Sequence, residues 1–260
     1  KPEKDIAAAY ALGVGLFAFE SDAELEKMAR LAPGSRVLVR ITVPSTGSMF
    51  PLNAKFGARP EEAPVLLEKA RALGLIPHGI AFHVGSQCER KETWAEAMEI
   101  ARRLWEDARG LGLSMLDIGG GFPAAYRDGV VGVEEIAGEV RAALASFPEG
   151  VRLALEPGRV MVADAGVLVA SVIGRAERDG RDWLYLDAGA LHGLFEAAQA
   201  GRLFPYKVST DRAGEASRHF VLTGPTCDPD DTILEDVALP EMEIGDRVAI
   251  INAGAYSLVY

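Results

Sequence analysis

The sequence contains few cysteines and no long hydrophobic run. Cys88 and Cys227 stand far apart and neither belongs to a CxxC pair, so we predict neither a metal site nor a disulfide framework. No stretch of about 18 consecutive apolar residues occurs, and the first residues do not show the charged and then apolar pattern of a secretory leader. These absences argue against membrane proteins and disulfide-rich secreted domains, and we expect a cytoplasmic protein with no membrane partner.

Positive charge is also scarce. The 260 residues include 27 Lys and Arg against 38 Asp and Glu, which gives a formal net charge of −11. Such a surface repels nucleic acids, so we expect no nucleic-acid partner. Hydrophobic residues make up 49% of the chain and charged residues 25%, as in ordinary globular proteins. The length allows one large α/β domain, or most of one with part of a second.

Apolar segments alternate with segments of helical periodicity through residues 1–155. The five predicted strands are residues 14–19, 37–41, 80–84, 113–118 and 152–155. Helices are predicted between them, for example over residues 63–73, where apolar side chains recur at helical spacing before Gly74. Strands linked by helical crossovers form a parallel sheet. Polar motifs follow the strands at their carboxyl ends, which favours a βα barrel over an open Rossmann sheet.

The later part of the chain predicts a second, β-rich domain. Residues 160–173 are apolar and β-branched without helical spacing, and residues 183–186, 219–222 and 247–252 have the composition of further strands. We therefore predict domains at residues 1–159 and 160–260. A closed barrel of this kind contains about eight strands, so we expect three strands to be missing before Lys1. We also expect the second domain to be cut before its end.

Residues that could bind a ligand or take part in a reaction follow the predicted strands. They are Arg40, His83, Ser86, Asp117, Gly119, Gly120, Gly121, Glu156 and Arg159, joined later by Cys227, Asp228 and Tyr256. Three adjacent glycines have no Cβ atoms, so backbone N–H groups there can approach an anion closely. Each residue by itself also fits a packing role or a local ion pair. Together they predict one site that contains a flat aromatic ring, a carboxylate, a cationic side chain and backbone N–H groups that can bind an anion.

A resemblance to a known family rests on five motifs, which are HVGS, DIGGGFP, EPGR, GPTCDxxD and GAY. In this order they resemble the fold-type III pyridoxal phosphate (PLP) decarboxylases, in the ornithine and lysine decarboxylase branch. The resemblance runs from about Lys1 to Tyr260. It implies part of a TIM-type βα barrel of the alanine-racemase-like kind, followed by a C-terminal β-rich domain, with PLP as the cofactor.

The resemblance also implies a role for each candidate residue. His83 would stack on the pyridine ring, and Glu156 would pair with the ring nitrogen. The residues implied to hold the phosphate or to line the cofactor are Ser86, Gly119, Gly120, Gly121, Arg159, Tyr256, Arg40 and Asp117. Cys227 would protonate the substrate carbon after CO₂ leaves, which makes it the third implied catalytic residue beside His83 and Glu156.

The same resemblance implies how the substrate and a second subunit would be engaged. Asp228 would bind the distal ammonium group of a small basic amino acid. In the family, the residues at Cys227 and Asp228 reach the cofactor of the other subunit, so we expect a homodimer with shared active sites. Lys55 would pair with Asp231 across that dimer.

The implied activity is decarboxylation of L-ornithine, L-lysine or both to a diamine and CO₂ in polyamine biosynthesis. A carboxylate at position 156 keeps a nearby ring nitrogen protonated, and a protonated ring accepts the electron pair that CO₂ leaves behind. Racemases of the same barrel family place an arginine there instead. The sequence does not separate ornithine from lysine.

Three alternative functions stay open. Diaminopimelate decarboxylases resemble the chain too, although they usually carry Cys-Glu-Ser where this chain has Cys227 followed by Asp228. A non-catalytic relative could act as a binding partner, as antizyme inhibitors do. A PLP carrier without substrate chemistry would not need Cys227 and Asp228, and it normally lacks a β domain.

The chain departs from the family pattern at one position. The family attaches its cofactor to a lysine in an Ala-x-Lys-x-Asn-type motif on the first barrel strand, and none of the seven lysines here lies in that context. We expect that lysine upstream of Lys1. An incomplete barrel also has two unpaired parallel edges. We therefore expect this polypeptide alone to be inactive and poorly stable.

Overall fold

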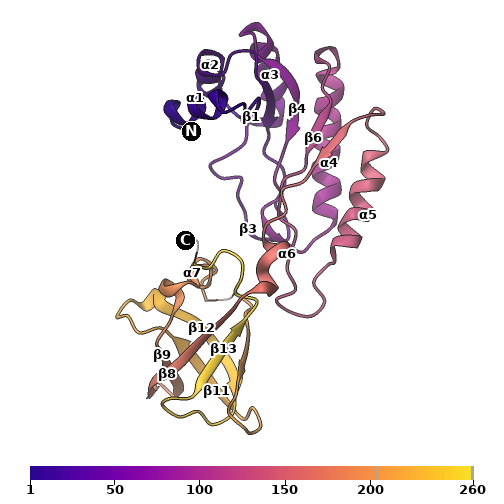
Figure 1. The fold of residues 1–260 in the computed structure, drawn as a ribbon. Helices are drawn as coiled ribbons and strands as arrows, with labels where there is room; N and C mark the ends of the chain where they lie inside the picture. The colour runs from indigo at the N-terminus through magenta and orange to yellow at the C-terminus, as the bar shows by residue number, and fades with distance from the viewer. Residues whose placement is uncertain (203, 259–260) are drawn as a thin grey trace. The chain divides into compact units, whose positions relative to one another are not determined.

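The structure is a computed structural model that describes residues 1–202 and 204–258 (Figure 1). The chain forms two compact units. The first comprises Lys1–Pro123 and Val131–Pro157, and the second comprises Ala124–Val130 and Gly158–Tyr260. The division after Pro157 lies close to the predicted boundary at residue 159. The sequence did not indicate that residues 124–130 belong with the second unit.

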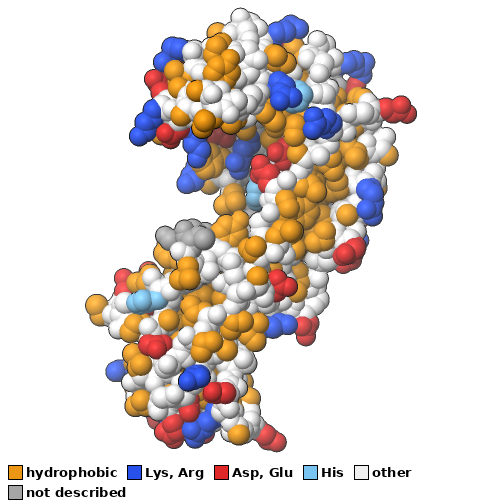
Figure 2. Space-filling view, in the orientation of Figure 1, with side chains coloured by type: hydrophobic (Ala, Val, Ile, Leu, Met, Phe, Trp, Pro, Cys, Tyr) orange, Lys and Arg blue, Asp and Glu red, His pale blue; other side chains and the backbone are white. Residues whose placement is uncertain are grey.

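The first unit is built on a five-stranded parallel sheet with the order β1-β2-β4-β6-β7. Its strands are β1 (Leu16–Phe19), β2 (Arg36–Arg40), β4 (Ile76–Ala81), β6 (Met115–Asp117) and β7 (Arg152–Ala154). The expected α/β architecture of a partial barrel is confirmed. β1 and β7 are the edge strands, and Leu153 and Leu155 on and after β7 are exposed. Figure 2 shows hydrophobic side chains on the visible face of this unit.

Helices connect the parallel strands, as the periodicity predicts. They are α2 (Asp22–Leu31), α3 (Ala63–Ala72), α4 (Glu92–Asp107) and α5 (Val133–Leu144), with short 3₁₀ turns at Pro60–Glu62 and Arg109–Leu111, while α1 (Glu3–Ala11) precedes β1. α4 and α5 lie side by side (Figure 1). On α4, Trp94 is 0% exposed and stacks on Phe122 with ring centroids 4.5 Å apart. The tryptophans of this helix therefore pack in the core, and no described helix is long and apolar enough to cross a membrane.

A small antiparallel ribbon in the first unit was missed by the sequence analysis. β3 (Ser48–Phe50) pairs with β5 (Ser86–Cys88), with Ser48 opposite Cys88 and Phe50 opposite Ser86. Each strand has three residues, which is too short to show alternation of apolar and polar side chains. The ribbon matters for the site because β5 begins directly after Gly85.

The second unit contains a six-stranded sheet with the order β10-β13-β8-β9-β11-β12, which confirms the expected β-rich region. Its strands are β8 (Val167–Arg178), β9 (Arg181–Leu186), β10 (Lys207–Thr210), β11 (Arg218–Thr223), β12 (Thr232–Leu239) and β13 (Arg247–Ile251). β9 and β11 are parallel, and the other neighbours are antiparallel. The remaining elements are α6 (Arg159–Val162), α7 (Phe195–Gln199), η3 (Ala163–Ala165), η4 (Ala190–His192) and η5 (Pro229–Asp231).

One prediction for the second unit was wrong, and two strands were missed. Residues 160–173 are not one strand, because α6 and η3 occupy residues 159–165 before β8 begins at Val167. This apolar segment is too short for its period to separate helix from strand. β10 and β12 were missed because polar and charged residues interrupt both, as in the β12 sequence TILEDVAL.

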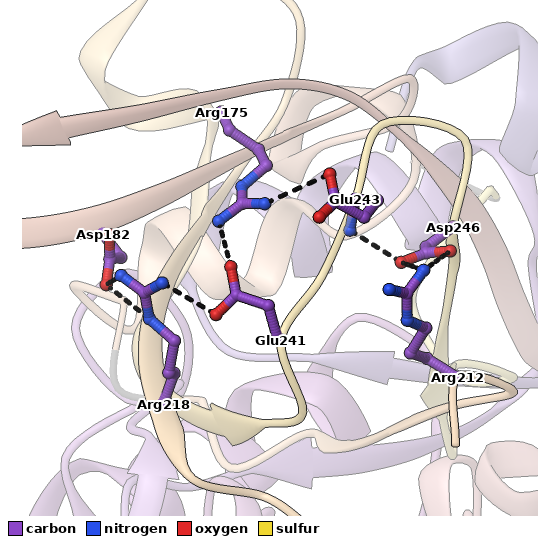
Figure 3. Close-up of polar contacts among 7 residues, drawn as sticks. All are labelled: Arg175, Asp182, Arg212, Arg218, Glu241, Glu243 and Asp246. Carbon is purple, nitrogen blue, oxygen red and sulfur yellow. Dashed lines mark hydrogen bonds and ion pairs between the residues drawn. The ribbon is translucent and has the colours of Figure 1, made fainter. Parts of the chain in front are cut away.

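Surface ion pairs tie neighbouring loops and strands of the second unit together (Figure 3). Glu241 accepts from Arg175 of β8 (2.5 Å) and from Arg218 of β11 (2.7 Å), and Arg218 also contacts Asp182 of β9. Arg212 contacts both oxygens of Asp246 at 3.2 Å. These groups are partly or well exposed, so each pair contributes little to stability.

We predict that Gly79→Ala destabilises the first unit strongly. A Cβ atom at Gly79 would lie 1.8 Å from the carbonyl oxygen of Met115, so the β4–β6 pairing would have to shift. We expect the free energy of unfolding to fall by about 3 kcal/mol, as for severe overpacking. The matched control is Gly138→Ala in α5, where no atom lies within 4 Å of the added Cβ. Equal urea midpoints for the two variants would contradict the prediction.

Candidate active site

The carboxyl ends of three neighbouring parallel strands gather the polar residues of the first unit. His83 follows β4, Asp117 ends β6, and Glu156 follows β7. The loops are joined by backbone hydrogen bonds, since the Glu156 N–H donates to the Gly119 carbonyl (2.8 Å) and the Phe82 N–H donates to the Asp117 carbonyl (2.9 Å). Residues that are far apart in the sequence therefore lie at one edge of the sheet.

The glycine triplet sits so close to these loops that no side chain fits. A Cβ atom at Gly119 would lie 2.2 Å from the Phe82 carbonyl oxygen, and one at Gly121 would lie 2.4 Å from that of Gly85. At Gly120 it would lie 2.6 Å from the Glu156 carbonyl oxygen and 3.0 Å from His83 Nε2. The triplet thus forms a backbone-lined surface directly beside the imidazole.

The carboxylate of Asp117 holds the first glycine of the triplet by a hydrogen bond. Its Oδ1 accepts a hydrogen bond from the Gly119 N–H at 2.9 Å, and Asp117 is buried. This bond engages the Gly119 N–H, so Asp117 and Gly119 support the loop, and a role of Gly120 and Gly121 as anion donors stays a prediction. The sequence motif alone did not distinguish the three glycines.

His83 presents a neutral, flat ring to this surface. Its Nδ1 accepts a hydrogen bond from the Gly85 N–H at 2.9 Å, which assigns the ring proton to Nε2. Burial, together with the positive charge of Arg40, lowers the pKa of His83 to about 4. The imidazole is therefore uncharged at pH 7.

The carboxylates of Asp117 and Glu156 lie close together. Partial burial and the neighbouring Asp117 carboxylate raise the pKa of Glu156, while Arg40 lowers it. Like charges at short range disfavour ionisation, and a cation bound next to Glu156 would relieve that repulsion. The Arg40 guanidinium itself lies over the Phe56 ring, 5.4 Å from its centroid.

Arg159 belongs to a buried cluster in the second unit. It is 3% exposed and pairs with Glu196 through two bonds, from Nη1 to Oε2 (2.7 Å) and from Nη2 to Oε1 (2.5 Å). Nη1 also donates to the hydroxyl of Tyr126 (3.2 Å), and the Tyr256 ring lies over the guanidinium at 4.8 Å. Burial opposes the charge on Arg159, but the contact with Glu196 outweighs it and raises the Arg159 pKa.

This cluster contains two of the residues predicted to bind phosphate. The structure brings Arg159 and Tyr256 together, as expected, but it adds Glu196 and Tyr126, which the sequence analysis missed. A glutamate within the otherwise apolar segment LFEAA was the available signal, since a buried acid needs a cationic or hydrogen-bonding partner. Because Glu196 engages both Nη atoms of Arg159, a role for Arg159 as phosphate ligand stays a prediction.

Cys227 and Asp228 lie in an exposed loop between β11 and β12. Asp228 caps η5, since its Oδ1 accepts a hydrogen bond from the Asp230 N–H at 2.9 Å. The expected pair of Asp231 with Lys55 across a dimer stays a prediction, and in this chain the Asp231 side chain is 0% exposed and bonded within its own unit. In the first unit, Lys55 Nζ lies over the Phe56 ring at 5.3 Å from the centroid.

The comparison with known proteins decides the family. The family described as "Pyridoxal-dependent decarboxylase, pyridoxal binding domain" matches residues 1–163, which include the glycine triplet, His83 and Glu156. The chain belongs to the pyridoxal-dependent decarboxylases. The resemblance inferred from the five motifs is therefore confirmed, and so is PLP as the cofactor of the family.

Curated relatives of this decarboxylase family match nearly the whole chain. The lysine/ornithine decarboxylase of Selenomonas ruminantium is 36% identical over 262 residues, which cover 100% of this chain and 66% of the relative. The ornithine decarboxylase of Mus musculus is 34% identical and covers 99% and 60%. Antizyme inhibitor 2 of Xenopus laevis is 35% identical and covers 95% and 58%. The chain thus spans about three fifths to two thirds of the length of these relatives.

Solved structures of pyridoxal-dependent decarboxylases share the fold. The arginine decarboxylase of Paramecium bursaria Chlorella virus bound to agmatine is 32% identical with a TM-score of 0.89, over 100% of this chain and 71% of that one. The lysine/ornithine decarboxylase from Vibrio vulnificus complexed with cadaverine is 37% identical with a TM-score of 0.86, over 99% and 68%.

The residues of the first unit fit the shape and charge of PLP. Gly120 and Gly121 pack against the loops that follow the neighbouring strands, and a phosphate is the anion that backbone N–H donors of such a segment suit. The neutral His83 ring matches a flat aromatic face. Glu156 beside Asp117 offers negative charge to a protonated ring nitrogen. Ser86 begins β5 next to Gly85, whose carbonyl adjoins Gly121.

We predict that His83 titrates near pH 4, well below the ordinary value of 6.5. Because the folded chain binds this proton less readily than the unfolded chain, stability from neutral His83 is complete above about pH 6.5 and is lost as the pH falls towards 4. Arg40→Gln should raise the pKa of His83. Arg36→Gln is the control, since the charge of Arg36 acts on His78 instead. An NMR titration that places the His83 midpoint near 6.5 would refute this assignment.

Proposed function

We propose that this chain forms the cofactor-binding and β-domain portion of a PLP-dependent decarboxylase that acts on a basic amino acid. The substrate is L-ornithine, L-lysine or both, and the products are CO₂ and a diamine used in polyamine biosynthesis. The enzyme works in the cytoplasm as a homodimer with shared active sites. The observation that carries the proposal is the glycine seat, Gly119–Gly121, which lies against the neutral His83 ring and the backbone carbonyl of Glu156.

The residues of the first unit would bind and orient the cofactor. Bound PLP supplies a protonated pyridine ring that accepts the electron pair left when CO₂ departs. The N–H groups of Gly120 and Gly121 hold the phosphate, and the uncharged His83 ring packs on one face without competing for the charge. Glu156 keeps the proton on the ring nitrogen, because an opposite charge at hydrogen-bonding distance favours the protonated form.

The exposed loop of the second unit supplies the substrate chemistry. Cys227 is a free thiol at the surface of this chain, and in the dimer it delivers a proton to the substrate carbon after CO₂ leaves. Asp228 binds the distal ammonium group. Its capping bond to the Asp230 N–H fixes one carboxylate oxygen and leaves the orientation of the group well defined.

The names of the relatives differ in the basic amino acid that serves as substrate. They include lysine/ornithine, ornithine and arginine decarboxylases, all of which act on amino acids with a distal cation. Ornithine and lysine differ by one methylene group, which a pocket discriminates by only about 1–3 kcal/mol. Diaminopimelate is less suited, because the residue after Cys227 is Asp rather than Glu.

A non-catalytic role is the second candidate, since antizyme inhibitor 2 is 35% identical to this chain. A protein that only binds a partner has no need of Cys227, Asp228, Glu156 and the glycine seat together. All of these are present, which supports the catalytic function.

We predict that Gly120→Ala weakens specific PLP binding. The added Cβ would occupy space 2.6 Å from the Glu156 carbonyl oxygen and 3.0 Å from His83 Nε2. We expect affinity to fall at least about tenfold in an absorbance titration, because phosphate donors are displaced. Gly138→Ala, with nothing within 4 Å, should bind PLP like the parent chain. Equal affinity in both variants would place the cofactor elsewhere.

We also predict that CO₂ release depends on Glu156. The product of the complete gene should release CO₂ from ornithine or lysine, and Glu156→Gln should lower the rate about 100-fold, since the ring nitrogen would no longer stay protonated. The 260-residue chain alone should release none. Assays should include arginine and diaminopimelate. No release from any of the four substrates would favour the binding role, and a preference for diaminopimelate would contradict the proposed substrate class.

A further inference from the structure

The second unit contains a fully buried carboxylate that the proposed reaction does not use. Asp231, at the end of η5, has a side chain that is 0% exposed. Its Oδ1 accepts a hydrogen bond from the Leu191 N–H at 3.0 Å. Its Oδ2 accepts from both the N–H (3.0 Å) and the hydroxyl (2.8 Å) of Thr226. One side chain therefore joins the loop after β9 to the loop after β11.

Two glycines make room for this carboxylate. A Cβ atom at Gly189 would lie 2.2 Å from Asp231 Oδ1, and one at Gly224 would lie 2.3 Å from Oδ2. The added Cβ of Gly189 would also lie 2.5 Å from the Cα of Gly224. The two loops thus meet around Asp231 at a separation that only glycine allows on both sides.

The charge of Asp231 is held mainly by neutral donors. Among the residues that the structure describes, the one basic side chain within 4.0 Å is the His192 ring, whose Nδ1 lies 3.9 Å from Oδ1. A buried carboxylate without a close cation depends on its hydrogen bonds. If one acceptor is removed, a buried N–H group is left without a partner, which costs more than the bond itself contributed.

We propose that Asp231 is a positioning residue that holds the Cys227–Asp228 loop and the Gly189–His192 segment in one joint arrangement. Backbone bonds from Gly224 N–H to the Asp231 carbonyl (2.8 Å) and from Asp231 N–H to the Asp228 carbonyl (3.1 Å) close the first loop on itself. The carboxylate then fastens this loop to the second segment. Its importance for the reaction rests on the proposed function, whereas the coupling of the loops does not.

Hydrogen–deuterium exchange with peptide mass spectrometry tests the coupling in the native chain. Asp231→Asn keeps the shape but has one acceptor oxygen, so either the Leu191 or the Thr226 N–H must face an NH₂ group. We expect exchange to become about tenfold faster in both residues 189–192 and residues 224–228. Gly224→Ala should give the same paired change, because it displaces the carboxylate without altering the charge.

Two controls separate this effect from general destabilisation. Asp230→Asn changes the adjacent carboxylate, whose side chain is 76% exposed. Gly174→Ala adds a methyl group in β8 at an ordinary contact of 3.5 Å. Neither control should alter exchange in the two loops. A change confined to residues 224–228, equal effects of Asp230→Asn and Asp231→Asn, or faster exchange throughout β8 and β13 would each overturn the proposal.

The positioning role and the proposed function can fail separately. If the paired exchange response occurs but the complete gene product releases no CO₂, the coupling stands and the decarboxylase proposal falls. If the complete gene product is active, Asp231→Asn should lower kcat about tenfold or more and raise KM at unchanged PLP affinity, since Cys227 and the substrate-binding Asp228 are displaced together while the cofactor seat is intact. Unchanged kcat in that variant would refute the positioning role.

Discussion

The arrangement of both units depends on places where backbone segments approach more closely than a Cβ atom allows. In the first unit, the Gly119–Gly121 segment touches the carbonyl groups of Phe82, Gly85 and Glu156, which belong to the loops after the neighbouring strands. In the second unit, Gly189 and Gly224 close around the Asp231 carboxylate. Within each unit, this close packing fixes the positions of neighbouring loops and therefore of the side chains that they carry.

Charge is distributed differently in the two units. The first combines a neutral imidazole with two neighbouring carboxylates, Asp117 and Glu156, which a bound cation would stabilise. The second buries a cation, Arg159, and neutralises it with a bidentate contact to Glu196. Such a pair fixes geometry more than it adds stability, because desolvation offsets the attraction. The electrostatics of each unit therefore suit the precise placement of groups around a charged ligand.

The sequence analysis predicted the features that depend on local patterns of residues. The five parallel strands, the helices between them and the set of residues at the strand ends follow from hydrophobic periodicity and motif order, and the family resemblance is confirmed. The pairing of Arg159 with Glu196, the burial of Asp231 and the engagement of the Gly119 N–H by Asp117 were not predictable in this way. Each depends on contacts between distant segments, and short motifs carry no signal for such contacts. The helical start of residues 159–165 was missed for a related reason, because a brief apolar run fits either helix or strand.

The central claim is that PLP binds on the glycine seat beside His83, and NMR of the imidazole signals tests it most directly. The chain has four histidines, and His219, whose side chain is 69% exposed, serves as an internal reference. On addition of PLP, the His83 signals and the Gly120 amide should shift together through the ring current of the cofactor, while the His219 signals stay in place. Inorganic phosphate should move the Gly120 amide with a much smaller effect on His83. If PLP leaves His83 unchanged, or shifts all four histidines alike, the account of this site is wrong.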